Sequence, residues 1–318
     1  SFKDVLISFV KEIPRAFNII FLYKSQVYAI RDVYGTRPFK ILKSNNDDCI
    51  YLTSEDYFLE SKCWINVDVS EGSLSIIDKN LNIDTITVLK HRPVKQTAHC
   101  VFEHIYFMNE NSMSDGFLVK DSRVKMGHIL ANNEDFFNDL ENGDYLVSSV
   151  PQTSTTSAKV YAKTLDLEYN QFIKKNKNSN RTFIENGDEK RNKTSKEKYI
   201  IDGDIIRNRN IIIVDDSIVR GITIKNLIEN LKKYEPKSIH VRVTSPPITN
   251  TCNLGIDIPT EDELIYNSFK TTEKLETYLD VQSLRYLKVS KLKEIFKEKG
   301  MCMGCINGDY NTNPALEW

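Results

Sequence analysis

Residues 211–221, Ile-Ile-Ile-Val-Asp-Asp-Ser-Ile-Val-Arg-Gly, constrain the fold more than any other stretch of this chain. Four β-branched residues form a short apolar run, typical of a strand buried in a parallel sheet. Two carboxylates and a polar turn that closes at Gly221 follow this run. Apolar residues then recur at the i, i+3, i+4 and i+7 spacing of an amphipathic helix, at Ile224, Leu227, Ile228 and Leu231. The segment therefore predicts a strand, an acidic loop and a helix in an α/β domain.

An acidic loop in this position suits a phosphorylated sugar. Ligands of open α/β sheets bind outside the carboxyl ends of the strands. The N–H groups at a helix N-terminus suit a phosphate, and the Asp215 and Asp216 carboxylates suit a ribose diol or a Mg²⁺ ion. Asp and Ser are also common helix N-caps, so the acidic pair alone leaves a purely structural role open.

Composition excludes several other classes of protein. Lys and Arg number 43 against 44 Asp and Glu, so the chain lacks the basic excess of nucleic-acid-binding proteins. No apolar run reaches the roughly 18 residues of a membrane span, and there is no signal peptide. The six cysteines are scattered over 318 residues, unlike the disulfide framework of a small secreted protein. We expect a cytoplasmic protein without nucleic-acid or membrane partners.

The pattern changes along the chain and predicts about two domains. The first third is rich in short strands, at 17–30 around a turn at 24–26, at 50–53 and at 73–78, after an amphipathic helix at 1–10. From residue 101 strands alternate with helices, as in a βαβ sheet. The strands of this part are expected at 145–150, 211–214 and 239–243, and the helices at 120–131, 155–165 and 290–299.

The segment from Lys174 to Lys198 is polar, with nine Lys or Arg residues against four acidic residues. A stretch this long without secondary structure is either functional or a solvated surface loop. The functional interpretation is a basic lid that closes over an anionic substrate and excludes water.

Several motifs together carry a resemblance to a known family. Val214–Gly221 resembles the phosphoribosyl-pyrophosphate (PRPP) loop of type I phosphoribosyltransferases, and its sequence is most similar to the form of this loop in the amidophosphoribosyltransferase family. Further segments resemble motifs of the same family in the same order, namely Arg31–Pro38, Cys100–Phe107, Arg181–Ile184, Ser245–Ile248 and Gly255–Thr260. On these motifs the chain is identified as a member of that family.

The resemblance implies a fold of the α/β and α+β classes. It implies a partial N-terminal-nucleophile glutaminase domain at 1–98 and a type I phosphoribosyltransferase domain with a parallel sheet at 99–318. The implied reaction is the first step of de novo purine (IMP) synthesis. In that step PRPP and glutamine, or ammonia, give 5-phosphoribosylamine, pyrophosphate and glutamate. Purine nucleotides are the expected feedback inhibitors, and a homo-oligomer is the expected assembly.

The resemblance also assigns roles to individual residues. Mg²⁺ is assigned to Thr153, Asp215 and Asp216, although Thr153 taken alone is more typical of a helix N-cap. PRPP binding is assigned to Asp215, Asp216, Ser217, Ile218, Val219, Arg220, Gly221, Thr223, Ser154, Lys175 and Arg181. The chain departs from the family pattern at Ile222, where a hydroxyl is lost, and at Gln152, which replaces an acid. We expect weakened, not abolished, PRPP binding.

Four cysteines match the ligand positions of the iron–sulfur subgroup of the family. Cys302 and Cys305 form a C-x-x-C motif, which alone is compatible with a redox pair, half a zinc site or two free thiols. With Cys100 and Cys252 they imply a structural [4Fe–4S] cluster, with tetrahedral zinc as the alternative.

The glutaminase nucleophile of the family is a cysteine at the mature N-terminus, and no residue here matches it. We therefore expect no glutamine hydrolysis by this chain alone and regard it as a fragment of a longer enzyme. An incomplete β layer is then expected to leave an exposed edge and an apolar face. The alternatives are an ammonia-dependent phosphoribosyltransferase with a dead glutaminase half and a non-catalytic PRPP-binding regulator. The acidic pair argues against the regulator.

Overall fold

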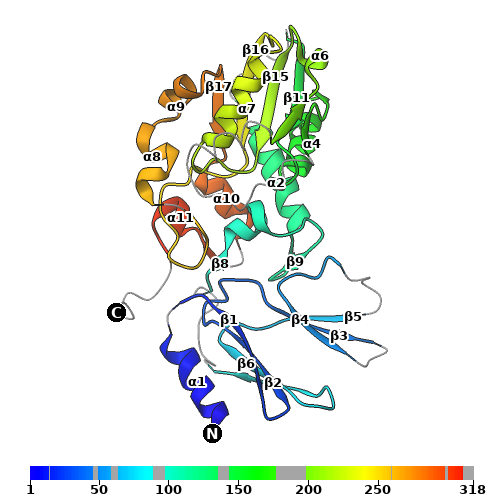
Figure 1. Cartoon of the computed structure of the whole chain (residues 1–318), viewed down its shortest axis with the longest axis vertical. Helices are drawn as coiled ribbons and strands as arrows, with labels where there is room; N and C mark the ends of the chain where they lie inside the picture. Colours follow the sequence, from blue (N-terminus) through cyan, green and yellow to red (C-terminus); the bar gives the residue numbers. More distant parts are fainter. Residues whose placement is uncertain are drawn as a thin grey trace. The chain divides into compact units, whose positions relative to one another are not determined.

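The computed structural model describes residues 1–13, 15–45, 49–58, 64–88, 97–134, 143–176, 198–258, 260–297 and 300–310. The chain divides into two compact units (Figure 1). Unit 1 consists of Ser1–Asp121, Cys252–Asp257 and Phe296–Trp318, and unit 2 of Ser122–Thr251 and Ile258–Ile295. Unit 1 thus extends beyond residue 98 and takes in two later segments. This division by compactness does not test the predicted domain boundary at 98/99, which stays a prediction. No helix in these described ranges is long and apolar enough to cross a membrane.

Unit 1 is built on two antiparallel sheets, which confirms the prediction of short strands in the first third of the chain. Strand orders are β1-β2-β6-β7 and β4-β3-β5. The first sheet contains β1 (Asn18–Tyr23), β2 (Gln26–Arg31), β6 (Ser73–Ile77) and β7 (Ile83–Thr87). The second contains β3 (Lys40–Ser44), β4 (Ile50–Thr53) and β5 (Trp64–Asp68). The predicted turn between β1 and β2 is made by Lys24 and Ser25, both at positive φ.

Helix α1 (Phe2–Glu12) covers one face of the first sheet. It begins with a capping box between Ser1 and Asp4, which supplies partners to N–H groups of its first turn. The Phe2 ring contacts the rings of Phe21 and Tyr28 edge-on, at centroid distances of 6.0 and 5.1 Å. The predicted N-terminal helix is therefore confirmed, and it packs on the odd-numbered side chains of β1.

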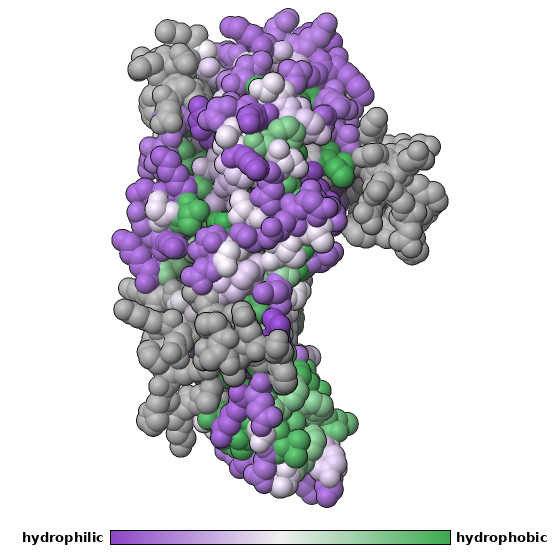
Figure 2. Space-filling model, turned by 90° about the vertical axis from the view of Figure 1, so that its left-hand side faces the viewer, coloured by the Kyte–Doolittle hydropathy of each residue, from purple (hydrophilic) through white to green (hydrophobic). Residues whose placement is uncertain are grey.

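The opposite face of β1 is apolar and exposed. Ile20 pairs with Ala29 of β2, and Ala29 is fully buried in a cluster with residues of the second sheet. Ile20 and Leu22 share this inner face, yet they are 52% and 78% exposed. Figure 2 shows hydrophobic surface on the part of unit 1 that carries α1 and β1 in Figure 1. Because β1 pairs only with β2 among the described strands, the sandwich is open at this edge, as expected from the sequence.

The rest of unit 1 brings distant segments together. Strand β8 (His99–Cys100) pairs in parallel with β18 (Met301–Cys302). The remaining elements are the π-helix Glu103–Phe107, strands β9 (Met113–Ser114) and β10 (Phe117–Leu118), and helix α11 (Gly304–Asn307). The pairing of β8 with β18 explains why the compact unit includes the end of the chain.

Unit 2 contains a five-stranded parallel sheet with the order β12-β11-β15-β16-β17 (Figure 1). Its strands are β11 (Tyr145–Ser149), β12 (Glu168–Tyr169), β15 (Asn210–Asp215), β16 (Ser238–Val243) and β17 (Ser283–Tyr286). The chain thus has the α/β fold with a parallel sheet that the sequence predicts. A two-stranded sheet of β13 (Ile173–Lys175) and β14 (Tyr199–Ile201) lies outside it.

Helices and short turns connect these strands. They are α2 (Val119–Asn132), α4 (Thr155–Thr164), α6 (Gly203–Ile206), α7 (Ile222–Lys232), α8 (Ile265–Phe269), α9 (Thr272–Leu279), α10 (Val289–Ile295) and a 3-10 turn at Glu261–Glu263. The predicted helices at 120–131 and 155–165 are confirmed to within one residue at each end. The helix predicted at 290–299 ends earlier, at Ile295.

The core of unit 2 follows from the two sequence patterns that predicted it. All six residues of β15 are buried, as expected for a central parallel strand. The apolar stripe of α7 packs on it through Ile224, Leu227, Ile228 and Leu231. This packing fixes the loop between β15 and α7 at the carboxyl end of the sheet.

Candidate active site at the carboxyl end of the parallel sheet

Two adjacent carboxylates lie where β15 ends. Asp215 is the last residue of the strand, and both Asp215 and Asp216 are less than 10% exposed. The Asp216 backbone N–H donates to Asp215 Oδ1 at 2.9 Å, and the Ser217 hydroxyl donates to Asp216 Oδ1 at 2.8 Å. These contacts leave most of the acceptor capacity of the pair without a protein donor among the described residues.

The surroundings oppose the ionisation of both groups. Burial raises the pKa of Asp215 well above its usual range, and the neighbouring Asp216 charge raises it further. Burial also raises the pKa of Asp216, to about 6, against the opposing effects of Ser217, Arg123 and Lys198. A cation or a hydroxyl donor at this place would relieve the cost of holding two charges here.

The loop that follows Asp216 is held in place by contacts with Ile265 and with the core of unit 2. Gly221 is the N-cap of α7 with φ +75°, and a Cβ there would lie 2.0 Å from Ile265 Cδ1. Only glycine fits both the conformation and the space. The Ile265 N–H donates to the Val219 carbonyl at 3.0 Å, and Ile218 is buried in the core. The loop is therefore held rigidly at the helix N-terminus, where the first N–H groups lack intrahelical acceptors.

The side chains of residues 217–223 differ in their exposure. Arg220 is exposed, and its Nε donates to Glu263 Oε2 at 2.8 Å. Thr223 is half-buried in the first turn of α7, and Ser217 is half-buried beside Asp216. Ile222, where the sequence departs from the family pattern, is 39% exposed. An apolar side chain thus stands at the start of the helix.

A second loop meets the acidic loop at the same edge of the sheet. The Val150 N–H donates to the Val214 carbonyl at 2.9 Å, which places residues 150–154 beside the end of β15. Ser154, and not Thr153, is the N-cap of α4, and its hydroxyl donates to the Val150 carbonyl at 2.6 Å. Thr153 is half-buried in the turn. The N-cap interpretation of Thr153 is therefore wrong, and its role as an Mg²⁺ ligand stays a prediction.

The basic residues predicted to approach the site are described only in part. Lys175 ends β13 and is exposed. Arg181 and residues 177–197 of the predicted lid lie outside the described residues. Two further cations act on the acidic pair, and the sequence analysis did not assign either of them to the site. The charges of Arg123 and Lys198 lower the pKa of Asp216. Arg123 lies on α2, nearly 100 residues before the acidic loop, and no local pattern marks it.

The four cysteines of the predicted cluster all belong to unit 1. Cys100 and Cys302 are register partners in β8 and β18, and Cys305 follows in α11. Burial raises the pKa of the Cys305 thiol to about 12, and the nearby Cys302 and Cys252 raise it as well. Among the described residues no three of these thiols lie within 4.8 Å of one another.

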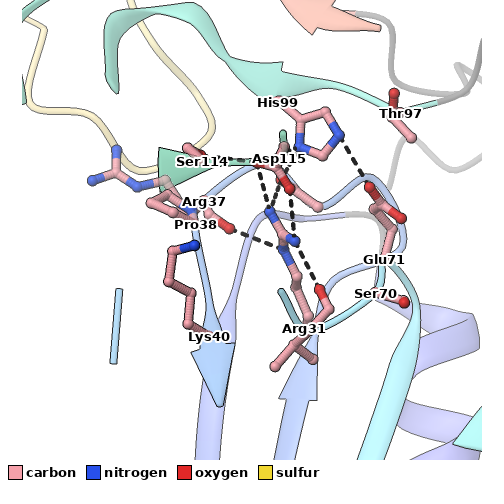
Figure 3. Close-up of polar contacts among 12 residues, drawn as sticks. Arg31, Arg37, Pro38, Lys40, Ser70, Glu71, Thr97, His99, Ser114 and Asp115 are labelled. Atoms are coloured by element: carbon pink, nitrogen blue, oxygen red, sulfur yellow. Dashed lines mark hydrogen bonds and ion pairs between the residues drawn. The ribbon is translucent and has the colours of Figure 1, made fainter. Parts of the chain in front are cut away.

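A second polar cluster lies in unit 1 (Figure 3). His99 Nδ1 lies 2.9 Å from Asp115 Oδ2, and His99 Nε2 lies 3.0 Å from Glu71 Oε1. Burial lowers the pKa of His99, but its hydrogen bonds to Asp115 and Glu71 outweigh burial and raise the pKa to about 9. Each of the three side chains offers one ligand atom within 4.8 Å of the others, so the group is a possible metal site. Since each ring nitrogen faces its own carboxylate, the arrangement suits an imidazolium better than a single ion.

Comparison with known proteins finds one family model and several relatives that are similar to this chain. The model of the phosphoribosyl transferase domain family matches residues 129–248, which include Asp215 and the loop after β11. An amidophosphoribosyltransferase of Pyrococcus horikoshii is 34% identical over 302 residues, covering 94% of this chain and 63% of the relative. The human amidophosphoribosyltransferase is 31% identical, covering 97% of this chain and 66% of the relative.

The chain belongs to the amidophosphoribosyltransferase family. Its fold agrees with that of a glutamine PRPP amidotransferase from B. subtilis complexed with ADP and GMP. The TM-score is 0.85 at 24% identity, and the match covers 98% of this chain and 68% of that chain. The chain thus spans about two thirds of the length of the amidophosphoribosyltransferases that it matches.

Proposed function

We propose that this chain carries the phosphoribosyltransferase site of an amidophosphoribosyltransferase, a glycosyltransferase of the first step of purine synthesis. The observation that carries the proposal is the buried Asp215–Asp216 pair at the end of a parallel strand, directly before a glycine-capped helix. In the proposed reaction the nitrogen of ammonia, released from glutamine, bonds to the anomeric carbon of PRPP. The bond from that carbon to pyrophosphate breaks, and a proton leaves the new amine.

The proposed roles follow from charge. The leaving pyrophosphate gains negative charge as its bond breaks, so the site must supply fixed donors and a metal ion. A pair of buried carboxylates fits Mg²⁺, which is bound by one or two carboxylates together with waters and substrate phosphates. Asp215 and Asp216 would hold the ribose hydroxyls and Mg²⁺, with Thr153 as a further ligand. N–H groups of residues 217–223 would bind the 5′-phosphate, and Lys175 and Arg181 the pyrophosphate.

Calorimetry with Mg-PRPP tests the binding site. Asp216→Asn should weaken the affinity at least about tenfold, a loss of roughly 1.4 kcal/mol. Asp144→Asn is the matched control, because Asp144 is an exposed acid of unit 2 in a surface ion pair with Arg209. Equal affinities of Asp216→Asn and the wild type would reject the assignment.

Pyrophosphate release tests the reaction itself. With an ammonium salt and Mg-PRPP the chain should release pyrophosphate slowly, and Asp216→Asn should release less. Tight binding of Mg-PRPP without any release would favour the non-catalytic regulator instead. Glutamate formation from glutamine by the chain alone would contradict the expected absence of the glutaminase nucleophile.

We also propose that Cys100, Cys252, Cys302 and Cys305 bind one [4Fe–4S] cluster. A single tetrahedral zinc ion with Zn–S bonds of about 2.3 Å would draw its thiolates to about 3.8 Å from one another. Support for a shared site comes from the mutual influence of the thiols, because, in addition to burial, Cys302 and Cys305 raise the pKa of Cys100, and Cys252 raises the pKa of Cys302 and of Cys305. Iron and sulfide analysis of anaerobically purified protein tests the choice, and zinc without iron would overturn it in favour of the alternative.

Four further expectations complete the proposal. Purine nucleotides are proposed as feedback ligands, and a homo-oligomer as the assembly. Residues 1–98 are proposed to be part of a glutaminase domain, and 99–318 the transferase domain. The cytoplasm is the proposed compartment, on the grounds of the scattered cysteines, although relatives from Glycine max and Arabidopsis thaliana are named as chloroplastic.

A further inference from the structure

Tyr286 has a buried hydroxyl that the packing of unit 2 does not explain. The residue ends β17, and its ring packs edge-on against Tyr266 at a centroid distance of 5.9 Å. Its hydroxyl oxygen is buried and has no hydrogen-bond partner among the described residues. A buried hydroxyl without a partner is destabilising, so a phenylalanine would fill this place at a lower free energy.

The register of the sheet aligns Tyr286 with the acidic pair. Asp215 pairs with Val243 of β16, and Val243 pairs with Tyr286. Partners in neighbouring strands point to the same face, and strands are spaced by about 4.8 Å, so the Cα atoms of Asp215 and Tyr286 lie roughly 10 Å apart. Ile213, Val243 and Leu284 of these strands all join the same core cluster. Both side chains therefore belong to the face that α7 covers.

The two groups are close enough to influence each other. Burial raises the pKa of Tyr286, and the charges of Tyr266 and Asp215 raise it further. The Asp215 carboxylate, in turn, accepts one hydrogen bond among the described residues, from the Asp216 N–H to Oδ1. The Tyr286 hydroxyl, which has no acceptor among the described residues, and the Asp215 carboxylate, which accepts a single hydrogen bond, thus lie on the same face of the sheet.

We propose that Tyr286 is a positioning residue for Asp215, whose hydroxyl donates to the Asp215 carboxylate when that carboxylate engages the ribose of PRPP. The inference rests on the proposed PRPP site. The donated hydrogen bond would orient Asp215 and stabilise its ionised form, which is the form that accepts from a ribose hydroxyl. Tyr286 itself touches neither the substrate nor the reacting atoms in this proposal.

Tyr286→Phe separates this role from packing, because it removes the hydroxyl and keeps the ring. The affinity for Mg-PRPP, measured by calorimetry, should fall about tenfold, as expected for loss of a hydrogen bond to a charged group. The unfolding temperature should stay unchanged or rise, because an unpartnered buried polar group is lost. Tyr266→Phe is the matched control, since it makes the same chemical change in the neighbouring ring and should leave the affinity unchanged.

The outcomes distinguish this inference from the proposed function. If the wild type binds Mg-PRPP and Tyr286→Phe binds it equally well, the positioning role is wrong and the PRPP site stands. A lowered unfolding temperature in Tyr286→Phe would mean that the hydroxyl has a structural partner, which also overturns the inference. If the wild type does not bind Mg-PRPP, the proposed function itself fails.

Discussion

At the scale of single residues, Arg31 has a hydrogen-bond acceptor for each of its five guanidinium N–H donors. Its guanidinium donates five hydrogen bonds at 2.7–3.3 Å, to the carbonyls of Gly35, Arg37 and Val69 and to both Asp115 oxygens (Figure 3). Lysine lacks the planar fork and cannot replace these contacts. We predict that Arg31→Lys lowers the free energy of unfolding by about 3 kcal/mol or more, measured by urea denaturation.

The exposed Arg15→Lys is the control for that prediction and should be nearly neutral. A loss below about 1 kcal/mol in Arg31→Lys would mean that the guanidinium contacts contribute little to stability.

His240 gives unit 2 a predictable pH dependence. Burial lowers its pKa to about 4, and the charges of Arg242 and Arg285 lower it further. The unfolded chain, with a histidine pKa near 6.5, takes up this proton at higher pH than the folded chain. The stability contribution is therefore complete above about pH 6.5 and is lost as the pH falls toward 4, by at most about 3 kcal/mol.

Replacing the imidazole should remove this part of the pH dependence. We predict that the stability difference between wild type and His240→Gln changes as the pH falls from about 7 to about 4.5, measured by urea denaturation at several pH values. Parallel stability curves for the two proteins would show that His240 titrates normally in the folded state.

Local sequence patterns identified site residues only where they are neighbours in the chain, and the more distant Thr153, Lys175 and Arg181 were assigned through the family resemblance. Asp215, Asp216 and Gly221 were predicted because one short segment holds the strand, the acids and the turn. Arg31 and Asp115 are 84 residues apart, and their ion pair exists only after folding. Tyr286 was missed for the same reason, since the register of three strands aligns it with Asp215. No local spacing encodes such contacts.

At the scale of elements, the long strands and helices were predictable and the short ones were not. Strands β11, β15 and β16 and helices α2, α4 and α7 carry enough residues for an apolar run or a helical period to appear. Strands β8, β9, β10, β12 and β18 have two residues each, too few to show any period. Their pairing is decided by tertiary contacts.

The open edge at β1 predicts self-association. A strand with a free edge and exposed apolar side chains is a template for pairing with another strand. Leu22→Lys should reduce concentration-dependent association, measured by sedimentation velocity, because a lysine on an edge strand opposes such pairing. Val5→Lys is the control, since Val5 is 63% exposed on α1 and not on a strand edge. Equal effects of both variants would point to general surface hydrophobicity instead.

At the scale of the whole molecule, the four cysteines of the proposed cluster lie on three segments of unit 1 that are far apart in sequence. If a metal centre links them, its loss should loosen those segments together. We predict that Cys302→Ser increases amide exchange in residues 97–108 and 300–310, while β15 and β16 stay protected. Ammonia-dependent activity per folded molecule should change less than stability.

Cys49→Ser is the control for this prediction, because Cys49 lies outside the four-thiol group and should leave exchange unchanged. Protection of residues 97–108 that is equal in Cys302→Ser and the wild type would show that the centre does not stabilise this part of unit 1.

The division of unit 1 into separated segments sets an order of events during synthesis. The last segment of unit 2 ends at Ile295, whereas unit 1 still needs the segment that starts at Phe296. Strand β8 cannot find its partner β18 until about 200 further residues have been translated, which takes roughly 10–40 s at 5–20 residues per second. The parallel sheet of unit 2 can therefore form on the ribosome before the first hundred residues have made all of their tertiary contacts. For the contact between β8 and β18, the usual order in which the N-terminal part folds first cannot hold.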